Sequence, residues 1–230
     1  MTSEELALFE RITWDLPGSG IERESFRRIE AEIDPEVRRR FSAEEWRIAR
    51  RLIHTTADFS IAELLRFSGD PITAGRSALR AGARIYSDSN MIKAGLSVPK
   101  LKRFCERYSR ESILCDVASP EVAELAARKG ITRALAAVEL HRKELEGCIF
   151  LCGNAPLALA GMIRMIVEEG IRPALMVGMP VGFVNVVEAK ELFIGGDTPY
   201  IIARGRKGGS NVAASIVNAL LYQMVHREGF

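Results

Sequence analysis

The stretch CIFLCGNAPLALAGMI, residues 148–163, decides the fold. It opens with five residues that are apolar and suited to a buried strand, and Gly153 and Asn154 then interrupt the run. Pro156 is favoured in the first turn of a helix, and the residues after it form a second apolar run. A strand therefore gives way to a helix within one short turn, which is typical of an α/β protein.

The same pattern recurs on both sides of this stretch. Short apolar runs predict further strands, and helical segments with capping residues, leading prolines or closing glycines lie between them. With the run above, the expected strands are 83–87, 112–116, 148–153, 174–179 and 200–205. Strands that are apolar throughout and separated by helices predict a three-layer αβα fold, with a mostly parallel sheet and ligands beyond its carboxyl ends.

The N-terminal part of the chain predicts helices only. Apolar residues at Ile21, Phe26, Ile29 and Ile33 share one helical face, and Asp34-Pro35 ends that pattern. A second helix is expected to begin after Ser42, because Glu45 completes a capping box, and to run through RLIHTT. We expect one domain over residues 1–230, with this helical segment preceding the α/β part.

Composition excludes several classes of protein. The net charge of +2 argues against a nucleic-acid-binding protein, whose binding face leaves a clearer basic excess. The four cysteines lack the spacing of a zinc site, and they are expected in the core. No apolar run approaches the ~20 residues that span a bilayer. The N-terminus carries acids where a secretory signal needs basic residues, so a cytoplasmic location is expected.

The chain contains three histidines, His54, His141 and His226. His54 falls in or just beyond the last turn of the expected helix after Ser42, where an imidazolium is favoured by the helix dipole. A capping role for His54 therefore stands beside a catalytic one. His141 is expected on a solvated helix face, and no motif surrounds His226.

Three glycine-bearing turns follow expected strands: GNAP at 153–156, GMPVGF at 178–183 and GRKGGSN at 205–211. Free N–H groups at a helix start bind anions, but tight turns also need glycine for geometry alone, so both readings stay open. In the last turn, Ser210 or Asn211 is expected to cap the following helix. Lys207 precedes the paired glycines, so the turn is not a phosphate loop of the GxxxxGK[ST] type.

In order, the segments PGSGIERESF, RLIHTTAD, SALRAGARIYSDSNMIKAGL, GITRALAAVEL, GNAPLAL, GMPVGFVNVVEAKELF and GRKGGSNVAASIVNALL resemble the precorrin-8X methylmutase family over nearly the whole chain. The resemblance implies an isomerase that moves a methyl group between adjacent carbons of precorrin-8 or cobalt-precorrin-8. The product is hydrogenobyrinate or cobyrinate, in vitamin B12 biosynthesis. It also implies a homodimer, no external cofactor and no metal site.

The resemblance places the family's catalytic histidine at His54. An imidazole with a pKa near ~6.5 donates and recovers a proton at neutral pH, as an isomerization without net proton change requires. The substrate carries many carboxylates, which arginine binds well. The expected substrate-binding residues are Ser25, Arg51, Asp88, Arg133, Asn154 and Arg206. For Asp88, capping of the helix that begins SNMIKAG is an equal alternative, and Met91 is expected near the pocket.

The sequence departs from the family pattern in places. Ala57 stands where glycine is usual, Ala134 replaces a serine, and Leu157 replaces a threonine in the GNAP segment. The charged segment KRFCERYSRES, residues 102–112, is expected to be an exposed connection. The motifs do not distinguish a substrate with cobalt from one without it.

Two further hypotheses belong to other classes of protein. One is a tetrapyrrole-binding or carrier protein without turnover, because the family that the chain resembles also holds its product tightly. The other is a nucleotide-binding α/β protein that uses GRKGGS as its anion loop.

Overall fold

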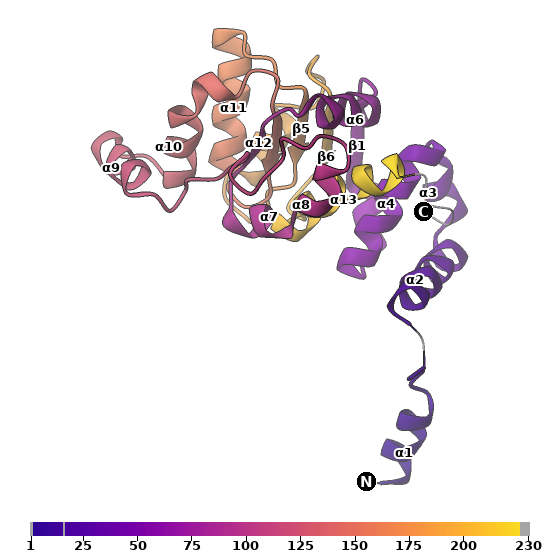
Figure 1. Cartoon of the computed structure of the whole chain (residues 1–230). Helices are drawn as coiled ribbons and strands as arrows, with labels where there is room; N and C mark the ends of the chain where they lie inside the picture. Colours follow the sequence, from indigo (N-terminus) through magenta and orange to yellow (C-terminus); the bar gives the residue numbers. More distant parts are fainter. Residues whose placement is uncertain (1, 16, 226–230) are drawn as a thin grey trace.

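The computed structural model of the chain describes residues 2–15 and 17–225 (Figure 1). Its centre is a six-stranded sheet in the order β1-β6-β5-β4-β2-β3. The strands are β1 (Leu65–Ser68), β2 (Ile85–Ser87), β3 (Ile113–Leu114), β4 (Ile149–Cys152), β5 (Leu175–Gly178) and β6 (Tyr200–Ala203). All neighbours are parallel except β1, which pairs antiparallel with β6. The predicted α/β class and mostly parallel sheet are confirmed.

The five predicted strands are all present, although each is shorter than the apolar run that indicated it. Strand β1 was missed, because Leu65–Ser68 is short, lies at the edge of the sheet and contains Arg66. Only Leu65 of this strand is fully buried. An edge strand covered on one side shows no continuous apolar run, so the signal used for the other strands does not find it.

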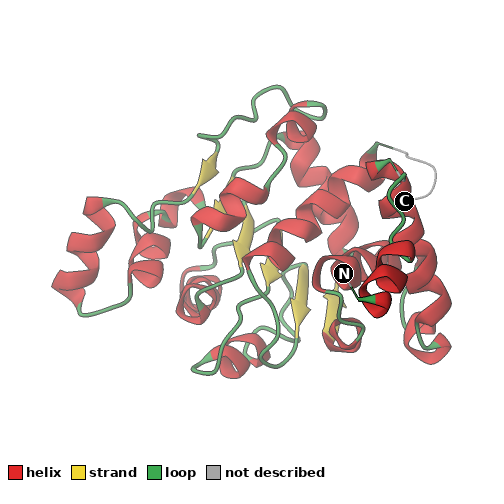
Figure 2. Ribbon diagram, turned by 90° about the horizontal axis from the view of Figure 1, so that it is seen from below, coloured by secondary structure: helices red, strands yellow, loops and turns green. Residues whose placement is uncertain are grey.

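Successive residues of the central strands enter two different cores. In β4, Ile149 and Leu151 pack in one cluster, whereas Phe150 and Cys152 pack in the other. Because side chains alternate across a sheet, this requires helices on both faces, as Figure 2 shows. The chain supplies them in two groups that lie on opposite sides of the strands.

One group contains α4 (Ala43–Thr56), α6 (Pro71–Ala81), α7 (Asn90–Gly95), α8 (Val98–Lys102) and α13 (Ser210–Met224). Helix α13 is central to this face, because it contacts α4, α6, α7 and the strands β4 and β5. The opposite face carries α10 (Arg133–Leu140), α11 (Pro156–Glu169) and α12 (Val186–Glu191). Helix α9 (Pro120–Lys129) packs on α10 at the far end of the molecule (Figure 1).

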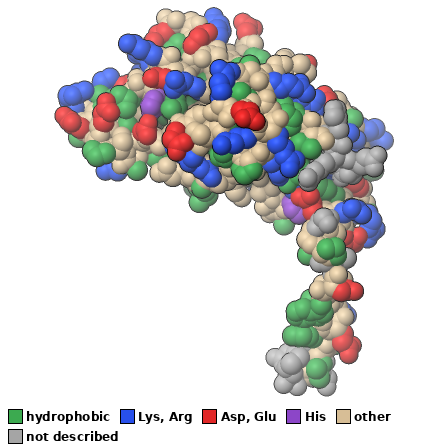
Figure 3. Space-filling view, in the orientation of Figure 1, with side chains coloured by type: hydrophobic (Ala, Val, Ile, Leu, Met, Phe, Trp, Pro, Cys, Tyr) green, Lys and Arg blue, Asp and Glu red, His purple; other side chains and the backbone are tan. Residues whose placement is uncertain are grey.

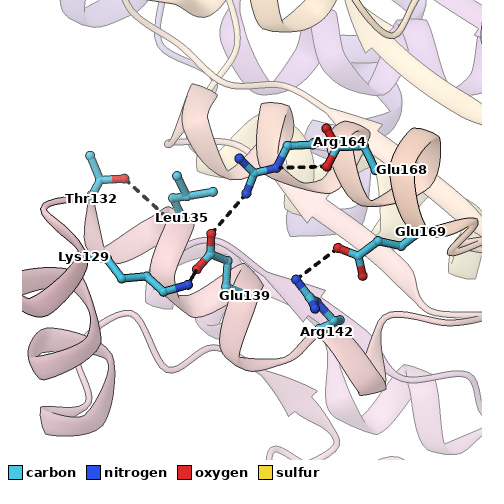
Figure 4. Close-up of polar contacts among 8 residues, drawn as sticks. All are labelled: Lys129, Thr132, Leu135, Glu139, Arg142, Arg164, Glu168 and Glu169. Atoms are coloured by element: carbon cyan, nitrogen blue, oxygen red, sulfur yellow. Dashed lines mark hydrogen bonds and ion pairs between the residues drawn. The ribbon is translucent and has the colours of Figure 1, made fainter.

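Ion pairs hold α9, α10 and α11 together on their outer surface (Figure 4). The carboxylate of Glu139 accepts from Lys129 at 2.6 Å and from Arg164 at 3.2 Å. Arg142, in the short 3₁₀ helix Arg142–Glu144, pairs with Glu169 at 3.0 Å. One carboxylate between two cations thus ties α10 to both of its neighbours.

The N-terminal helices are α1 (Ser3–Glu10), α2 (Gly18–Glu32), α3 (Pro35–Arg39) and, after α4, α5 (Ser60–Leu64). The break at Asp34-Pro35 is confirmed, since the Asp34 side chain accepts from the Glu36 N–H and starts α3. The predicted capping box is also confirmed, with both Ser42–Glu45 hydrogen bonds present. Helix α1 projects away from the rest of the molecule (Figure 1).

One local prediction is wrong and a second holds only in part. Helix α13 has no side-chain cap, because its N-cap residue is Gly209 and Ser210 is already the first helical residue. The Ser210 hydroxyl bonds the Ser89 hydroxyl at 2.8 Å. Most of the segment 102–112 is exposed, as expected, but Tyr108 is buried and its hydroxyl donates to the Ala83 carbonyl at 2.9 Å, which anchors the segment to the core. Within the described residues, no helix has the length and apolar character that crossing a membrane requires.

Candidate active site

His54 lies in the last turn of α4, which ends at Thr56 before Ala57 adopts a left-handed conformation with φ of 52°. The ring is half-buried and packs edge-on against Phe26 of α2. Its Nδ1 atom lies 2.7 Å from the hydroxyl of Ser25. Nε2 has no hydrogen-bond partner within residues 2–15 and 17–225. The Ser25 contact therefore fixes the ring and leaves Nε2 for a ligand.

Arg51 lies one turn before His54 and is almost fully buried. Its guanidinium donates to Glu22 of α2 at 2.6 Å and stacks near the rings of Phe26 and Tyr222. Helix α2 thus supplies Glu22 and Ser25 to the same end of α4. Both contacts follow from the helical face that the sequence predicted for residues 21–33.

The environment of His54 disfavours its charged form. Burial is the largest cause of a lowered pKa, and the Arg51 cation lowers the pKa further, while the Glu22 carboxylate acts in the opposite direction. Because the ordinary histidine pKa is near ~6.5, the free protein holds His54 mostly neutral at pH 7. A ligand that brings negative charge here would raise the pKa of His54.

His54 opens into a cleft of about 440 Å³ between α4, α8 and α13. This volume is within the range of small-molecule sites. The wall is polar on all three helices, and its residues are Arg51, His54, Thr55, Ser97, Lys100, Ser215, Asn218 and Tyr222. The prediction from sequence missed all of these except Arg51 and His54. A signal was present, because Ser215, Asn218 and Tyr222 recur on one face of an otherwise apolar helix.

The GRKGGSN turn lies beside the end of α4. The Lys207 ammonium donates to Asp58 at 2.6 Å, and Thr55 bonds Ser215 in the following helix at 3.1 Å. Gly208 is required here, since an added Cβ would lie 2.2 Å from the Met179 carbonyl oxygen. Arg206 is exposed and lies over the ring of Phe183 at 5.3 Å.

Lys190 of α12 binds the backbone of the GRKGGSN turn. The sequence analysis gave no signal for this role of Lys190. The side chain is fully buried, and its ammonium donates to the carbonyls of Gly205 at 2.9 Å and Lys207 at 2.8 Å. Burial lowers the pKa of Lys190 to about 8. The two carbonyl contacts fix the backbone on either side of Arg206.

Asp88 and Asn154 meet away from the cleft, where β2 and β4 end. The Asp88 carboxylate is buried and accepts from the backbone N–H groups of Gly153 at 3.0 Å, Asn154 at 2.8 Å and Ala155 at 2.6 Å. Asp88 thus occupies the anion-binding turn that the sequence offered to a substrate carboxylate. Ser89, and not Asp88, caps α7. The Asn154 side chain is exposed.

The remaining candidates are scattered. Arg133 is exposed at the start of α10, and Met91 is exposed on α7. The expectation that His141 lies on a solvated face is wrong, because its ring is largely buried and its Nε2 lies 2.6 Å from the Asp116 carboxylate. His226 lies outside the described residues. In the described part of the chain, no group of three or more His, Cys, Asp or Glu side chains has the arrangement of a metal site.

Comparisons with known proteins match a part of the chain that includes every residue of the cleft. The family model described as Precorrin-8X methylmutase matches residues 20–223. A cobalt-precorrin-8 methylmutase from Leptospira interrogans is 39% identical over 213 residues, which are 89% of this chain and 93% of that protein. A precorrin-8X methylmutase from Pseudomonas aeruginosa is 38% identical over 205 residues, covering 88% and 94% of the two chains.

Among solved structures, one described as precorrin-8X methyl mutase from Thermus thermophilus matches with a TM-score of 0.78 and 42% identity. The match covers 89% of this chain and 95% of that one. Residues 1–19, which include α1, lie outside the family model.

Proposed function

The chain belongs to the precorrin-8X methylmutase family and is an isomerase of vitamin B12 biosynthesis, and on that premise we propose that His54 performs its proton chemistry in the cleft between α4, α8 and α13. The substrate is precorrin-8 or its cobalt form, since relatives carry both names. The match over residues 20–223 supports a single domain for this activity.

The observation that carries the proposal is the orientation of one ring. Ser25 engages Nδ1 of His54 at 2.7 Å, so Nε2 is the atom available to a bound molecule. Protonated Nε2 donates its proton to the macrocycle, the methyl group moves to the adjacent carbon, and the proton returns to Nε2. No proton is gained or lost over the cycle, which matches an isomerization.

The lowered pKa of His54 fits this sequence of steps. Burial and Arg51 disfavour the imidazolium in the free protein, so a proton on Nε2 is readily given up. Carboxylate arms of the substrate offset the Arg51 charge when they enter, and the pKa of His54 rises. Binding of the substrate thus promotes protonation of the group that must donate.

The shape of the cleft suits an edge of the macrocycle. A tetrapyrrole with its arms is larger than 440 Å³, so only part of it enters between the helices. Arg206 of the exposed GRKGGSN turn is then placed to meet an arm outside the cleft, and Arg133 and Asn154 remain proposals for more distant arms. Asp88 acts through the backbone turn before α11 and does not face the substrate.

We further propose that the chain forms a homodimer through its N-terminal helices. Helix α1 and the residues after it project from the body and carry hydrophobic side chains into solvent, as Figure 3 shows. They are Leu6, Leu8, Phe9, Ile12 and Trp14, all about half exposed or more. A surface of this kind is covered in many proteins by a second copy of the chain.

The test is conversion of precorrin-8 followed by absorption spectroscopy. Wild-type protein is expected to convert the pigment, whereas His54→Ala is expected to bind it without conversion. His141→Ala, which removes a histidine remote from the cleft, controls for general damage and is expected to retain activity. Conversion by His54→Ala at the wild-type rate would contradict the role of His54, and binding without conversion by the wild type would indicate a carrier.

A further inference from the structure

Lys100 is a cation without an ion-pair partner among the described residues that line the His54 cleft. Among the residues that line the cleft, Arg51 and Lys100 are cations and none is an acid. Arg51 already pairs with Glu22 at 2.6 Å. Lys100 has no carboxylate within ion-pair distance among the residues that the structure describes. The positive charge that the cleft offers to a ligand therefore comes mainly from Lys100.

The ammonium of Lys100 is held in place without being neutralised. It lies 3.4 Å from the centre of the Tyr222 ring, a cation–π contact that orients a charge and leaves its donors available. Tyr222 itself also lies within 5.2 Å of the Arg51 guanidinium. One aromatic ring thus stands between the two cations of the cleft.

The helix that carries Lys100 is fixed to the opposite wall. The Asn218 amide of α13 donates to the Gly95 carbonyl at 2.9 Å and accepts from the Ser97 N–H at 3.3 Å. Ser97 directly precedes α8, so these bonds set the start of the helix relative to the cleft. Lys100 is therefore presented from a helix whose start is hydrogen-bonded to α13, which helps to position a binding residue.

We propose that Lys100 is a substrate-binding residue, whose ammonium receives a carboxylate arm of the macrocycle while His54 acts on the ring. The inference rests on the proposed function of the cleft and adds a residue that the motifs did not indicate. Lys100 and Arg51 have different tasks. Arg51 acts on the protonation of His54, whereas Lys100 is not among the charges that shift the pKa of His54.

The experiment compares Lys100→Met with Lys102→Met. Lys102 lies on the same short helix but is exposed and does not line the cleft, so both variants lose one charge from α8. The probes are precorrin-8 for kinetics and hydrogenobyrinate for binding, each followed by absorption. Loss of one charge-assisted contact is expected to raise KM and the Kd of hydrogenobyrinate about tenfold in Lys100→Met. Its kcat and the pH dependence of kcat are expected to be unchanged.

Lys102→Met is expected to behave as the wild type, and Lys100→Arg is expected to restore most of the affinity because it keeps the charge. Wild-type affinity in Lys100→Met, or an equal loss in both methionine variants, would overturn the inference. Either result would leave the His54 proposal intact if His54→Ala is still inactive. If His54→Ala is active while Lys100→Met binds weakly, the role of His54 fails and that of Lys100 stands.

Discussion

The hydroxyl of Ser25 lies 2.7 Å from Nδ1 of His54, although the two residues are 29 positions apart in sequence. The contact joins α2 to the last turn of α4 and engages Nδ1, so that Nε2 is the ring nitrogen without a partner among the described residues. The Ser25 hydroxyl can donate to Nδ1 or accept from it, so the contact orients the ring in either tautomer.

Replacing Ser25 with alanine should therefore impair turnover more than binding. Loss of the orienting hydrogen bond is expected to lower kcat about tenfold with little change in KM. Steady-state kinetics with precorrin-8 measures both values. Ser77→Ala makes the same chemical change on the exposed face of α6 and should have no effect. An unchanged kcat in Ser25→Ala would show that the ring needs no orienting partner.

The pKa of His54 is expected below its ordinary value in the free protein, because burial and Arg51 both disfavour the cation. Replacing Glu22 with glutamine removes the charge that favours the cation, so the pKa should fall further. NMR titration of the His54 imidazole protons in the wild type and in Glu22→Gln measures both shifts. A higher pKa in Glu22→Gln than in the wild type would contradict this electrostatic description.

The same shift predicts how stability depends on pH. The folded protein favours neutral His54, so its contribution to the free energy of unfolding is full above the ordinary pKa near ~6.5. That contribution is lost as the pH falls through the lower pKa of the folded state.

Ala57 offers a separate prediction about stability. It holds φ of 52° after α4, a conformation that costs an alanine more than a glycine. Ala57→Gly is expected to raise the free energy of unfolding by about 0.5–1 kcal/mol, after allowance for the freer unfolded chain. Denaturant titration measures the change. Ala127→Gly, within α9, should instead destabilise the protein, and stabilisation by both variants would contradict the conformational explanation.

Asp88 is expected to matter for folding and not for substrate affinity. Its carboxylate accepts from three consecutive backbone N–H groups, and an asparagine there would present an amide to some of the same donors. Asp88→Asn should lower the free energy of unfolding by about 2–4 kcal/mol. Asp70→Asn is the matched control, because asparagine caps helices well and tolerates the left-handed conformation at this position. A higher KM with unchanged stability in Asp88→Asn would restore Asp88 as a substrate ligand.

The elements that were predicted correctly from the sequence each carry one strong local signal, such as an apolar run or a capping box. Strands β2 to β6 are buried, so continuous apolar runs mark them, and the Ser42–Glu45 box marks the start of α4. The edge strand β1 has no such run. His54 and Arg51 were found because they share one helix with a recognisable motif, and their meeting with Ser25 follows from the packing of α2 on α4.

The rest of the site depends on tertiary contacts. Nothing local indicates that Lys190 reaches two carbonyls of a distant turn, or that Asp88 satisfies the start of α11. Lys100 lies just before the charged segment 102–112, and no motif marks it. The dimer and the cytoplasmic location stay predictions from the resemblance and from composition.

The most direct test of the His54 cleft is a crystal structure of the protein with bound hydrogenobyrinate. One edge of the macrocycle is expected between α4, α8 and α13, within hydrogen-bond distance of Nε2 of His54 and with a carboxylate arm at Lys100. A macrocycle bound elsewhere, or a His54 ring whose Nε2 points away from it, would contradict the account.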